Sequence, residues 1–276
     1  MRFAICNETF QDWPHAKACA FAAELGYTGW EIAPFTLGKN AFEISSAARA
    51  QVRREAEEAG LEIIGLHWLL AKTEGFYLTT PDEAVRRRTA EYISELARMC
   101  HELGGHVMVL GSPLQRNLLS GVSHPDAMQY AADCLRQTLP VLEANNVTIA
   151  VEPLGPAEGD FLNTAALGAE LCGLVGSPHC RLHLDVKAMS SESTPIPDIL
   201  RQQAKLLEHF HANDPNRRGP GMGEMDFLPI LRTLGEIDYR GWVSVEVFDY
   251  SPGIEALARE SINYLRDCLA ELAHGE

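Results

Sequence analysis

The chain has 276 residues, of which 46% are hydrophobic, and its 38 acidic against 23 basic residues give a net charge of -15 at pH 7. An apolar share of this size can fill a complete core, and α/β barrels of about 250 residues form one domain, so we expect one domain over residues 1–276. The acidic excess argues against nucleic acid as a partner, because a phosphate backbone is bound by clustered Lys and Arg.

The sequence also lacks the patterns of a membrane or secreted protein. The strand-like RFAIC follows Met1 without a charged and apolar leader, and no apolar stretch approaches the roughly 20 residues that span a bilayer. The 7 cysteines are scattered without a CxxC pair, which favours reduced thiols over disulfides in a chain of this size. We therefore expect a soluble, cytoplasmic protein with no membrane partner.

Eight short β-type runs alternate with helical runs along the chain. In chain order the runs are RFAIC (2–6), TGWEIA (28–33), LEIIGLH (61–67), HVMVLG (106–111), VTIAVE (147–152), RLHLD (181–185), LEHFH (207–211) and GWVSVE (241–246). Such alternation is typical of a parallel sheet covered by helices. Because no linker separates the units, the pattern predicts a single-domain α/β fold, the (β/α)8 TIM barrel.

Helical signals fill the intervals between these runs. The segment Thr80-Pro81-Asp82-Glu83 has the spacing of a capping box with Pro at the first helical position, and apolar residues at helical spacing follow as far as Gly104. The last helix follows Ser251-Pro252 and carries one apolar stripe between Ile254 and Leu272. We expect both helices to pack on the outside of the barrel.

Four metal-ligand side chains close the last four strand-like runs: Glu152, Asp185, His211 and Glu246. Alternate residues of a strand face opposite sides, so these four should face the barrel interior while Val151 and its counterparts face the helices. In a TIM barrel the carboxyl ends of the strands form the mouth of the active site. The four side chains should therefore converge there, and a divalent metal is the simplest reason to gather them.

Each of the four also has an ordinary explanation when taken alone, as a helix cap or as a hydrogen-bonded core histidine. Together they are harder to explain without a metal, because three neighbouring buried carboxylates would force at least one to stay protonated. Three carboxylates and one imidazole suit Mn²⁺ best, with Mg²⁺ or Co²⁺ as alternatives, rather than a structural zinc site, although Zn²⁺ stays open as the bound ion.

The motifs around these residues resemble those of the xylose isomerase-like superfamily of TIM barrels, in its sugar phosphate isomerase/epimerase group, which includes the ketose 3-epimerases. The matching segments are AVEP at 150–153, HLD at 183–185, HANDPNRRGPGMGEMDF at 211–227 and VSVEVF at 243–248. The resemblance implies that Glu152 and Glu246 are both metal ligands and catalytic bases on opposite faces of the substrate. It also implies that Glu158 supports Glu152 and that Arg217 holds a substrate hydroxyl; for Glu158 a solvated loop acid is the alternative.

One position departs from the epimerase pattern. Those relatives carry a substrate-contacting His three residues after the metal Asp, whereas this chain reads Asp185-Val186-Lys187-Ala188. Because Ala188 cannot make that contact, the departure puts a free ketohexose as substrate in doubt. Lys187 is either a sign of a different or more acidic substrate or an exposed loop lysine.

Further residues near the expected mouth are weaker candidates. His67 ends the third run and either contacts substrate or is a core histidine, and Arg116 follows the fourth run as another substrate contact. Trp13 and Trp68 are expected to flank the rim as an apolar wall. The GPGMG segment at 219–223 matches no phosphate-binding pattern, so a turn is favoured there.

These observations favour a metal-dependent isomerase or epimerase that transfers a proton α to the carbonyl of a keto sugar or keto cyclitol through an enediolate. A lyase of the same superfamily, such as an inosose dehydratase or an enzyme that eliminates from a keto-glycoside, is the alternative. An endonuclease-like hydrolase ranks lower, because the fourth run ends in VLGSP without a histidine. The expected partner is a small sugar or cyclitol, and a homo-oligomer, dimer or tetramer, is left open.

Overall fold

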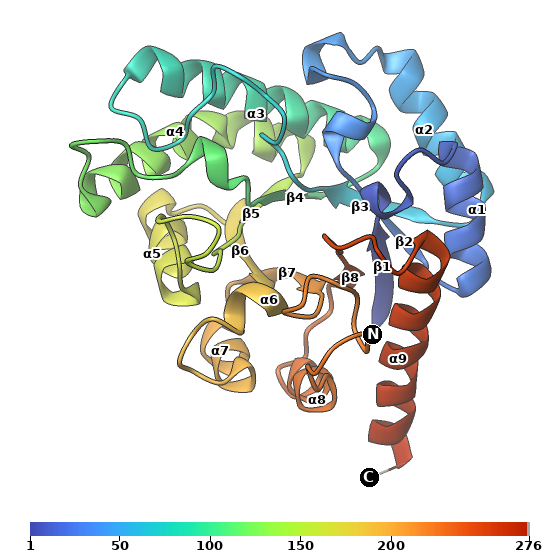
Figure 1. Cartoon of the computed structure of the whole chain (residues 1–276). Coiled ribbons are helices and arrows are strands. Elements are labelled where there is room, and N and C mark those ends of the chain that lie inside the picture. Colours follow the sequence, from blue (N-terminus) through green and yellow to red (C-terminus); the bar gives the residue numbers. More distant parts are fainter. Residues whose placement is uncertain (275–276) are drawn as a thin grey trace.

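The computed structural model describes residues 1–274 and contains a closed barrel of parallel strands in chain order (Figure 1). Each strand pairs with the next, and β1 also pairs with β8, so the sheet has no edge. The strands are β1 (Arg2–Cys6), β2 (Gly29–Ile32), β3 (Glu62–Leu66), β4 (Val107–Leu110), β5 (Thr148–Val151), β6 (Cys180–Asp185), β7 (Leu207–Ala212) and β8 (Trp242–Val245). The predicted single-domain (β/α)8 barrel is confirmed.

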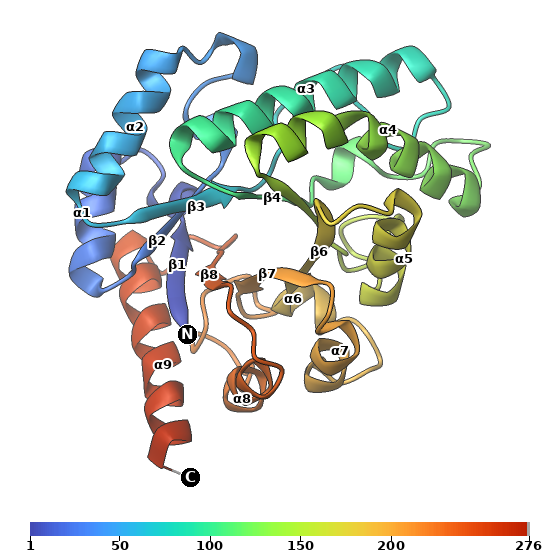
Figure 2. The same ribbon diagram turned by 180° about the vertical axis from the view of Figure 1, so that it is seen from behind.

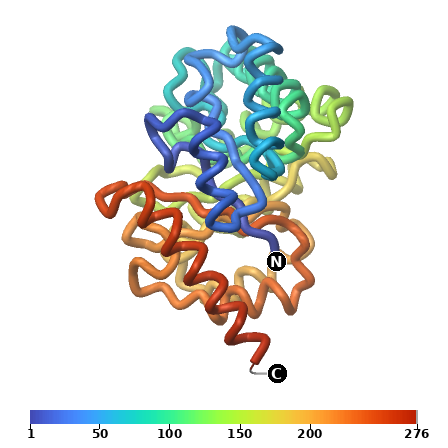
Figure 3. The backbone as a smooth tube through the Cα atoms, turned by 90° about the vertical axis from the view of Figure 1, so that its right-hand side faces the viewer, coloured from blue at the N-terminus to red at the C-terminus, as the bar shows by residue number. Residues whose placement is uncertain are grey.

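The helices surround the barrel in both face views (Figures 1 and 2). They are α1 (His15–Leu25), α2 (Ser46–Glu58), α3 (Glu83–Leu103), α4 (His124–Asn145), α5 (Ala165–Val175), α6 (Val186–Met189), α7 (Ile196–Gln203), α8 (Leu228–Glu236) and α9 (Ile254–His274). Figure 3 shows α9, in red, running along the outside of the barrel. Within residues 1–274, no helix combines the length and the apolar character needed to cross a membrane.

The start of α3 differs from the sequence-based expectation. The helix begins at Glu83, and its cap is Asp82, whose Oδ1 accepts hydrogen bonds from the backbone N–H of Ala84 at 2.9 Å and Val85 at 3.2 Å. Thr80 instead accepts a hydrogen bond from the N–H of Asp82 at 3.2 Å. The carboxylate of Asp82 satisfies two free N–H groups and is favoured by the helix dipole, so it replaces the predicted threonine cap.

The alternation of side chains along the strands gives the barrel two different layers. Val151, Leu184, Phe210 and Val245 are buried in the main hydrophobic core, as expected for residues that face the helices. The intervening positions include His183 and His209, whose rings lie 5.4 Å apart although they come from neighbouring strands. The barrel interior therefore carries the polar residues.

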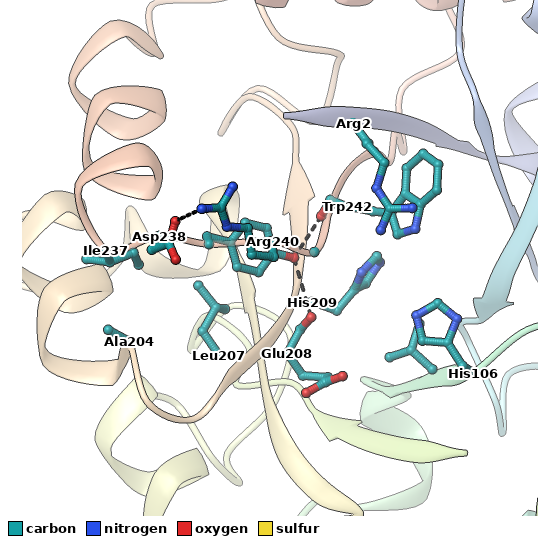
Figure 4. Close-up of a pocket in the computed structure, with 13 residues that line it drawn as sticks. Arg2, His106, Ala204, Leu207, Glu208, His209, Ile237, Asp238, Arg240 and Trp242 are labelled. Atoms are coloured by element: carbon teal, nitrogen blue, oxygen red, sulfur yellow. Dashed lines mark hydrogen bonds and ion pairs between the residues drawn. The ribbon is translucent and has the colours of Figure 1, made fainter. Parts of the chain in front are cut away.

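Ala4, Ile64 and Trp242 form a small apolar cluster apart from the main core, and Trp242 begins β8 at the amino end of the barrel. A Cβ on Gly29 would lie only 2.7 Å from both the Trp242 ring and the Ala4 side chain, so the glycine makes room for this packing. A cavity of about 330 Å³ also lies at this end, lined by Arg2, Trp242 and residues near them (Figure 4). Because barrel active sites lie at the opposite, carboxyl end, we assign this cavity no catalytic role.

Candidate metal centre and active-site mouth

The four metal-ligand candidates meet at the carboxyl end of the barrel. Glu152 directly follows β5, Asp185 ends β6, His211 lies in β7, and Glu246 directly follows β8. One donor atom from each residue lies within 4.8 Å of a donor atom from every other, and all four residues are buried. The buried cluster is consistent with a metal site.

The electrostatics of this cluster also fit a bound cation. Burial raises the pKa of Glu152 well above its usual value, and the nearby carboxylates of Glu246 and Asp185 raise it further. Burial likewise raises the pKa of Asp185, partly offset by the charge of Lys187. Like charges held this close favour either a shared proton or a cation, and the oxygen-rich donor set is one that binds divalent metals.

His211 is oriented by a carboxylate on the far side of its ring. Its Nδ1 lies 3.1 Å from Oε2 of Glu246, and its Nε2 lies 3.1 Å from Oε1 of Glu31 in β2. Burial acts to raise the pKa of Glu31, but His209 and His211 together hold it well below its usual range. A carboxylate behind a metal-binding histidine fixes the ring orientation and raises its basicity.

Trp68 and Gly111 set the positions of the two glutamates. The indole Nε1 of Trp68 donates a hydrogen bond of 2.6 Å to Oε1 of Glu246, and its ring stacks on Phe248 with centroids 6.0 Å apart. Gly111 follows β4 beside Glu152, and a Cβ at this position would collide with the Glu152 carboxyl group. The missing side chain is therefore required for Glu152 to lie where it does.

A pocket of about 350 Å³ opens above the metal-ligand candidates. Its polar lining includes four of the predicted site residues, namely Glu152, Glu158, Arg217 and Glu246, and its apolar lining includes Trp68, Leu154 and Phe248. The shape and composition suit a small molecule with hydroxyl groups and one apolar face.

A family model described as a xylose isomerase-like TIM barrel matches residues 19–268. The chain belongs to the xylose isomerase-like TIM barrel family. Among the relatives of this xylose isomerase-like barrel is the D-psicose 3-epimerase of Agrobacterium fabrum, 28% identical over 246 residues that cover 86% of this chain and 82% of the relative. The 3-dehydro-D-guloside 4-epimerase of Escherichia coli is 22% identical over 277 residues, covering 97% of this chain and 100% of that protein.

A solved structure supports the fold over nearly the full length. The crystal structure of a D-psicose 3-epimerase in the presence of D-fructose matches with a TM-score of 0.85 at 23% identity, covering 98% of this chain and 99% of the other. The recognition of the xylose isomerase-like family, with ketose 3-epimerases as distant homologues, is thereby confirmed.

Lys187 lies next to Ala188, the position at which this xylose isomerase-like barrel departs from the expected epimerase pattern. Its Nζ lies 2.6 Å from Oε2 of Glu158 and 4.8 Å from the centre of the Phe248 ring, and its side chain is mostly buried. Lys187 is therefore not an exposed loop lysine. Its charge is paired with that of Glu158, and a different or more acidic substrate stays a prediction.

The loops after β7 and β8 are joined beside Arg217. Its carbonyl oxygen accepts hydrogen bonds of 2.8 Å from the backbone N–H of both Phe248 and Asp249. Asp249 also accepts bonds from the backbone of Ser251 and from Nε of Arg218, which lower its pKa to about 2. These contacts hold Arg217 at the pocket, where its predicted contact with a substrate hydroxyl stays a prediction.

The GPGMG segment forms a turn, as favoured from the sequence. The N–H of Met222 donates to the carbonyl oxygen of Gly219 at 3.1 Å, and Nδ2 of Asn216 donates to the carbonyl oxygen of Met222 at 2.8 Å. Gly221 has a φ of 80°, a backbone conformation that glycine adopts readily.

Arg116 and Trp13 are both absent from the pocket lining. Arg116 is 2% exposed, and its Nη1 donates to the carbonyl oxygen of Leu110 at 3.1 Å. Burial lowers its pKa to about 10, its charge acts on the nearby Glu152, and its predicted contact with substrate stays a prediction. Trp13 packs against Phe21, with ring centroids 5.4 Å apart, and is absent from the pocket lining, because apolar packing decides its position.

His67 lies inside the barrel rather than at the pocket surface. It is fully buried, and its Nε2 lies 2.7 Å from Oε2 of Glu8. Sequence reasoning missed Glu8 and Glu31, although the alternation of Gly29 and Glu31 in β2 already indicated an inward glutamate.

Proposed function

We propose that the chain is a divalent-metal-dependent epimerase or isomerase that moves a proton α to the carbonyl of a keto sugar or keto cyclitol. The observation that carries this proposal is the presence of Glu152 and Glu246 in one pocket, within 4.8 Å of each other and of two further metal-ligand candidates. The names of the relatives, which include ketose 3-epimerases and a 4-epimerase of a 3-dehydro-glycoside, support this class of substrate.

In this proposal Glu152, Asp185, His211 and Glu246 hold the metal. A divalent ion there would polarise the substrate carbonyl and stabilise the negative charge that develops when the neighbouring carbon loses its proton. Mn²⁺ is the proposed ion because the donor set is rich in oxygen, and Mg²⁺ or Co²⁺ would serve the same chemistry.

The two glutamates divide the proton transfer between them. They follow β5 and β8, which are not neighbours in the barrel, so they reach the pocket from different directions. One glutamate removes the proton and the other returns a proton from the other side, which inverts the carbon. The hydrogen bond from Trp68 keeps Glu246 in place for this step, and Arg217 binds a substrate hydroxyl at the mouth.

Solvent exchange tests the proposal. The Mn²⁺-loaded protein is incubated in D₂O with D-psicose, D-fructose, L-ribulose and a 3-keto-glucoside, and NMR measures deuterium at the carbon α to the carbonyl. We expect exchange with at least one of them, its loss on chelation and its return with Mn²⁺. Absence of exchange with all four contradicts the proposal, whereas an unsaturated product absorbing in the ultraviolet points to the lyase.

Substitution of one base sharpens this experiment. Glu246→Gln is expected to abolish exchange and to weaken metal binding while the fold is retained, because it removes one charged ligand. The matched control is Glu62→Gln, at an exposed glutamate at the start of β3. Near-normal turnover by Glu246→Gln is incompatible with the two-base scheme.

A further inference from the structure

A second group of metal-ligand side chains lies inside the barrel, on the first three strands. It consists of Cys6 at the end of β1, Glu31 in β2 and His67 just after β3, which we call the inner triad. All three residues are 0% exposed, and one donor atom of each lies within 4.8 Å of the others. The inner triad shares no residue with the four ligand candidates at the mouth.

The spacing of the inner triad would allow one ion between its three residues, although the Cys6 thiol is also placed to donate a weak hydrogen bond to Glu31. Cys6 Sγ lies 3.7 Å from Oε2 of Glu31, and Nδ1 of His67 lies 3.7 Å from Oε1 of the same carboxylate. The second distance is too long for a hydrogen bond between nitrogen and oxygen. Metal bonds of about 2.0 to 2.3 Å in a tetrahedral site place neighbouring ligand atoms about 3.3 to 3.7 Å apart.

The different surroundings of the two ring nitrogens of His67 also indicate a metal ligand. Its Nε2 is bound to Glu8 at 2.7 Å, whereas its Nδ1 is buried and has no hydrogen-bond partner among residues 1–274. A carboxylate on one nitrogen and a free lone pair on the other is the arrangement found behind metal-binding histidines. A buried nitrogen without any partner would otherwise be costly.

We propose that the inner triad is a second metal site, with Cys6, Glu31 and His67 as ligands of one divalent ion. A thiolate, an imidazole and a carboxylate form a softer set than the one at the mouth and suit Zn²⁺. On binding, the Cys6 thiol loses its proton to solvent and its sulfur forms the bond to the ion. The ion would tie β1, β2 and β3 together directly behind His211, whose Nε2 contacts Glu31.

The competing explanation is a proton in place of the ion. A doubly protonated His67 between Glu8 and Glu31 would also balance the two buried carboxylates, without involving the thiol. The thiol therefore distinguishes the two cases, because only a metal in the inner triad forms a bond to sulfur.

Cobalt titration of the full-length metal-free protein provides the test. We expect two equivalents of Co²⁺ per chain, with a near-ultraviolet charge-transfer band from sulfur to cobalt. Cys6→Ser should lose the band and one equivalent, whereas Asp185→Asn should lose the other equivalent and keep the band. Cys100→Ser is the matched control, since Cys100 is equally buried but lies outside the cluster, and it should keep both.

Several results would overturn the inner site. If the wild-type protein binds Co²⁺ without the charge-transfer band, Cys6 is not a ligand, and a proton on His67 explains how the buried carboxylates are balanced. If the band survives Cys6→Ser, the sulfur ligand is another cysteine. If Cys6→Ser fails to fold by circular dichroism, His67→Gln serves as the second variant and must also lose the band. The proposed epimerase activity is judged separately by solvent exchange, so either proposal can fail while the other stands.

Discussion

Trp68→Phe tests whether Glu246 depends on the indole for its position and charge. The substitution removes the N–H that donates 2.6 Å to Oε1 of Glu246 and leaves an aromatic ring to pack on Phe248. Trp68 has a φ of 53°, a strained backbone conformation that tryptophan and phenylalanine tolerate equally. The change is therefore confined mainly to one hydrogen bond.

The magnitude follows from the kind of bond that is lost. A hydrogen bond to a charged group contributes about 1.5 to 3 kcal/mol. Trp68 is only partly buried, so water can replace some of the lost interaction, and the lower value of about 1.5 kcal/mol applies. If Glu246 transfers a proton in the slow step, this loss corresponds to about a tenfold lower rate.

The assay is the rate of deuterium incorporation from D₂O at saturating Mn²⁺, compared with wild type under the same conditions. Trp13→Phe is the matched control, because Trp13 lies among Phe10 and Phe21 away from the pocket, and it should leave the rate unchanged. A Trp68→Phe rate within twofold of wild type, or an equal fall in both variants, would refute the reasoning.

Three further substitutions follow from contacts at and near the mouth. Glu31→Gln should weaken Mn²⁺ binding about 10- to 100-fold in calorimetry, because His211 loses the carboxylate that orients it. Gly111→Ala should lower solvent exchange at least about tenfold by displacing Glu152. Asp249→Asn should reduce stability to urea at pH 6. The difference should shrink progressively as the pH falls from about 4 through about 2, since the folded-state pKa is lowered to about 2 and the contribution is lost as that carboxylate protonates.

Each of these three substitutions has a control variant or an outcome that would contradict the prediction. Unchanged Mn²⁺ binding in Glu31→Gln, or equal weakening in Glu62→Gln at the exposed start of β3, would remove the assigned role of Glu31. Gly173→Ala in α5 meets open space and should leave exchange intact, so a similar loss there would point to a general effect of added side chains. A stability difference for Asp249→Asn that is as large at pH 2 as at pH 6 would show that its charge is not the cause.

The strands and their inward faces could be read from the sequence because the barrel imposes a strict alternation on each strand. Val151 packs toward the helices and His183 lies inside, as the period of two requires. The cap of α3 was misplaced by two residues, since Thr80 and Asp82 both carry an oxygen that can accept from a free N–H. Only the folded backbone decides between two candidates so close in the sequence.

The ligand candidates of the second half could be found because a charged residue that ends an apolar strand stands out. The burial of Arg116 could not be predicted, since the sequence does not show whether a loop arginine lines a pocket or donates to a backbone carbonyl such as that of Leu110. Glu31 and Glu8 were missed for a different reason: their histidine partners are 36 to 180 positions away in the sequence, and only the closed barrel brings them together.

The pairing of β1 with β8 has a consequence for how the protein is made in the cell. β1 leaves the ribosome long before β8 is synthesised, so one edge of β1 stays unpaired during most of translation. Glu246 directly follows that last strand, and a four-ligand cluster is thus complete only when translation has reached the segment before α9. Binding of an ion by all four side chains would then require that β8 has been synthesised and that the barrel has closed.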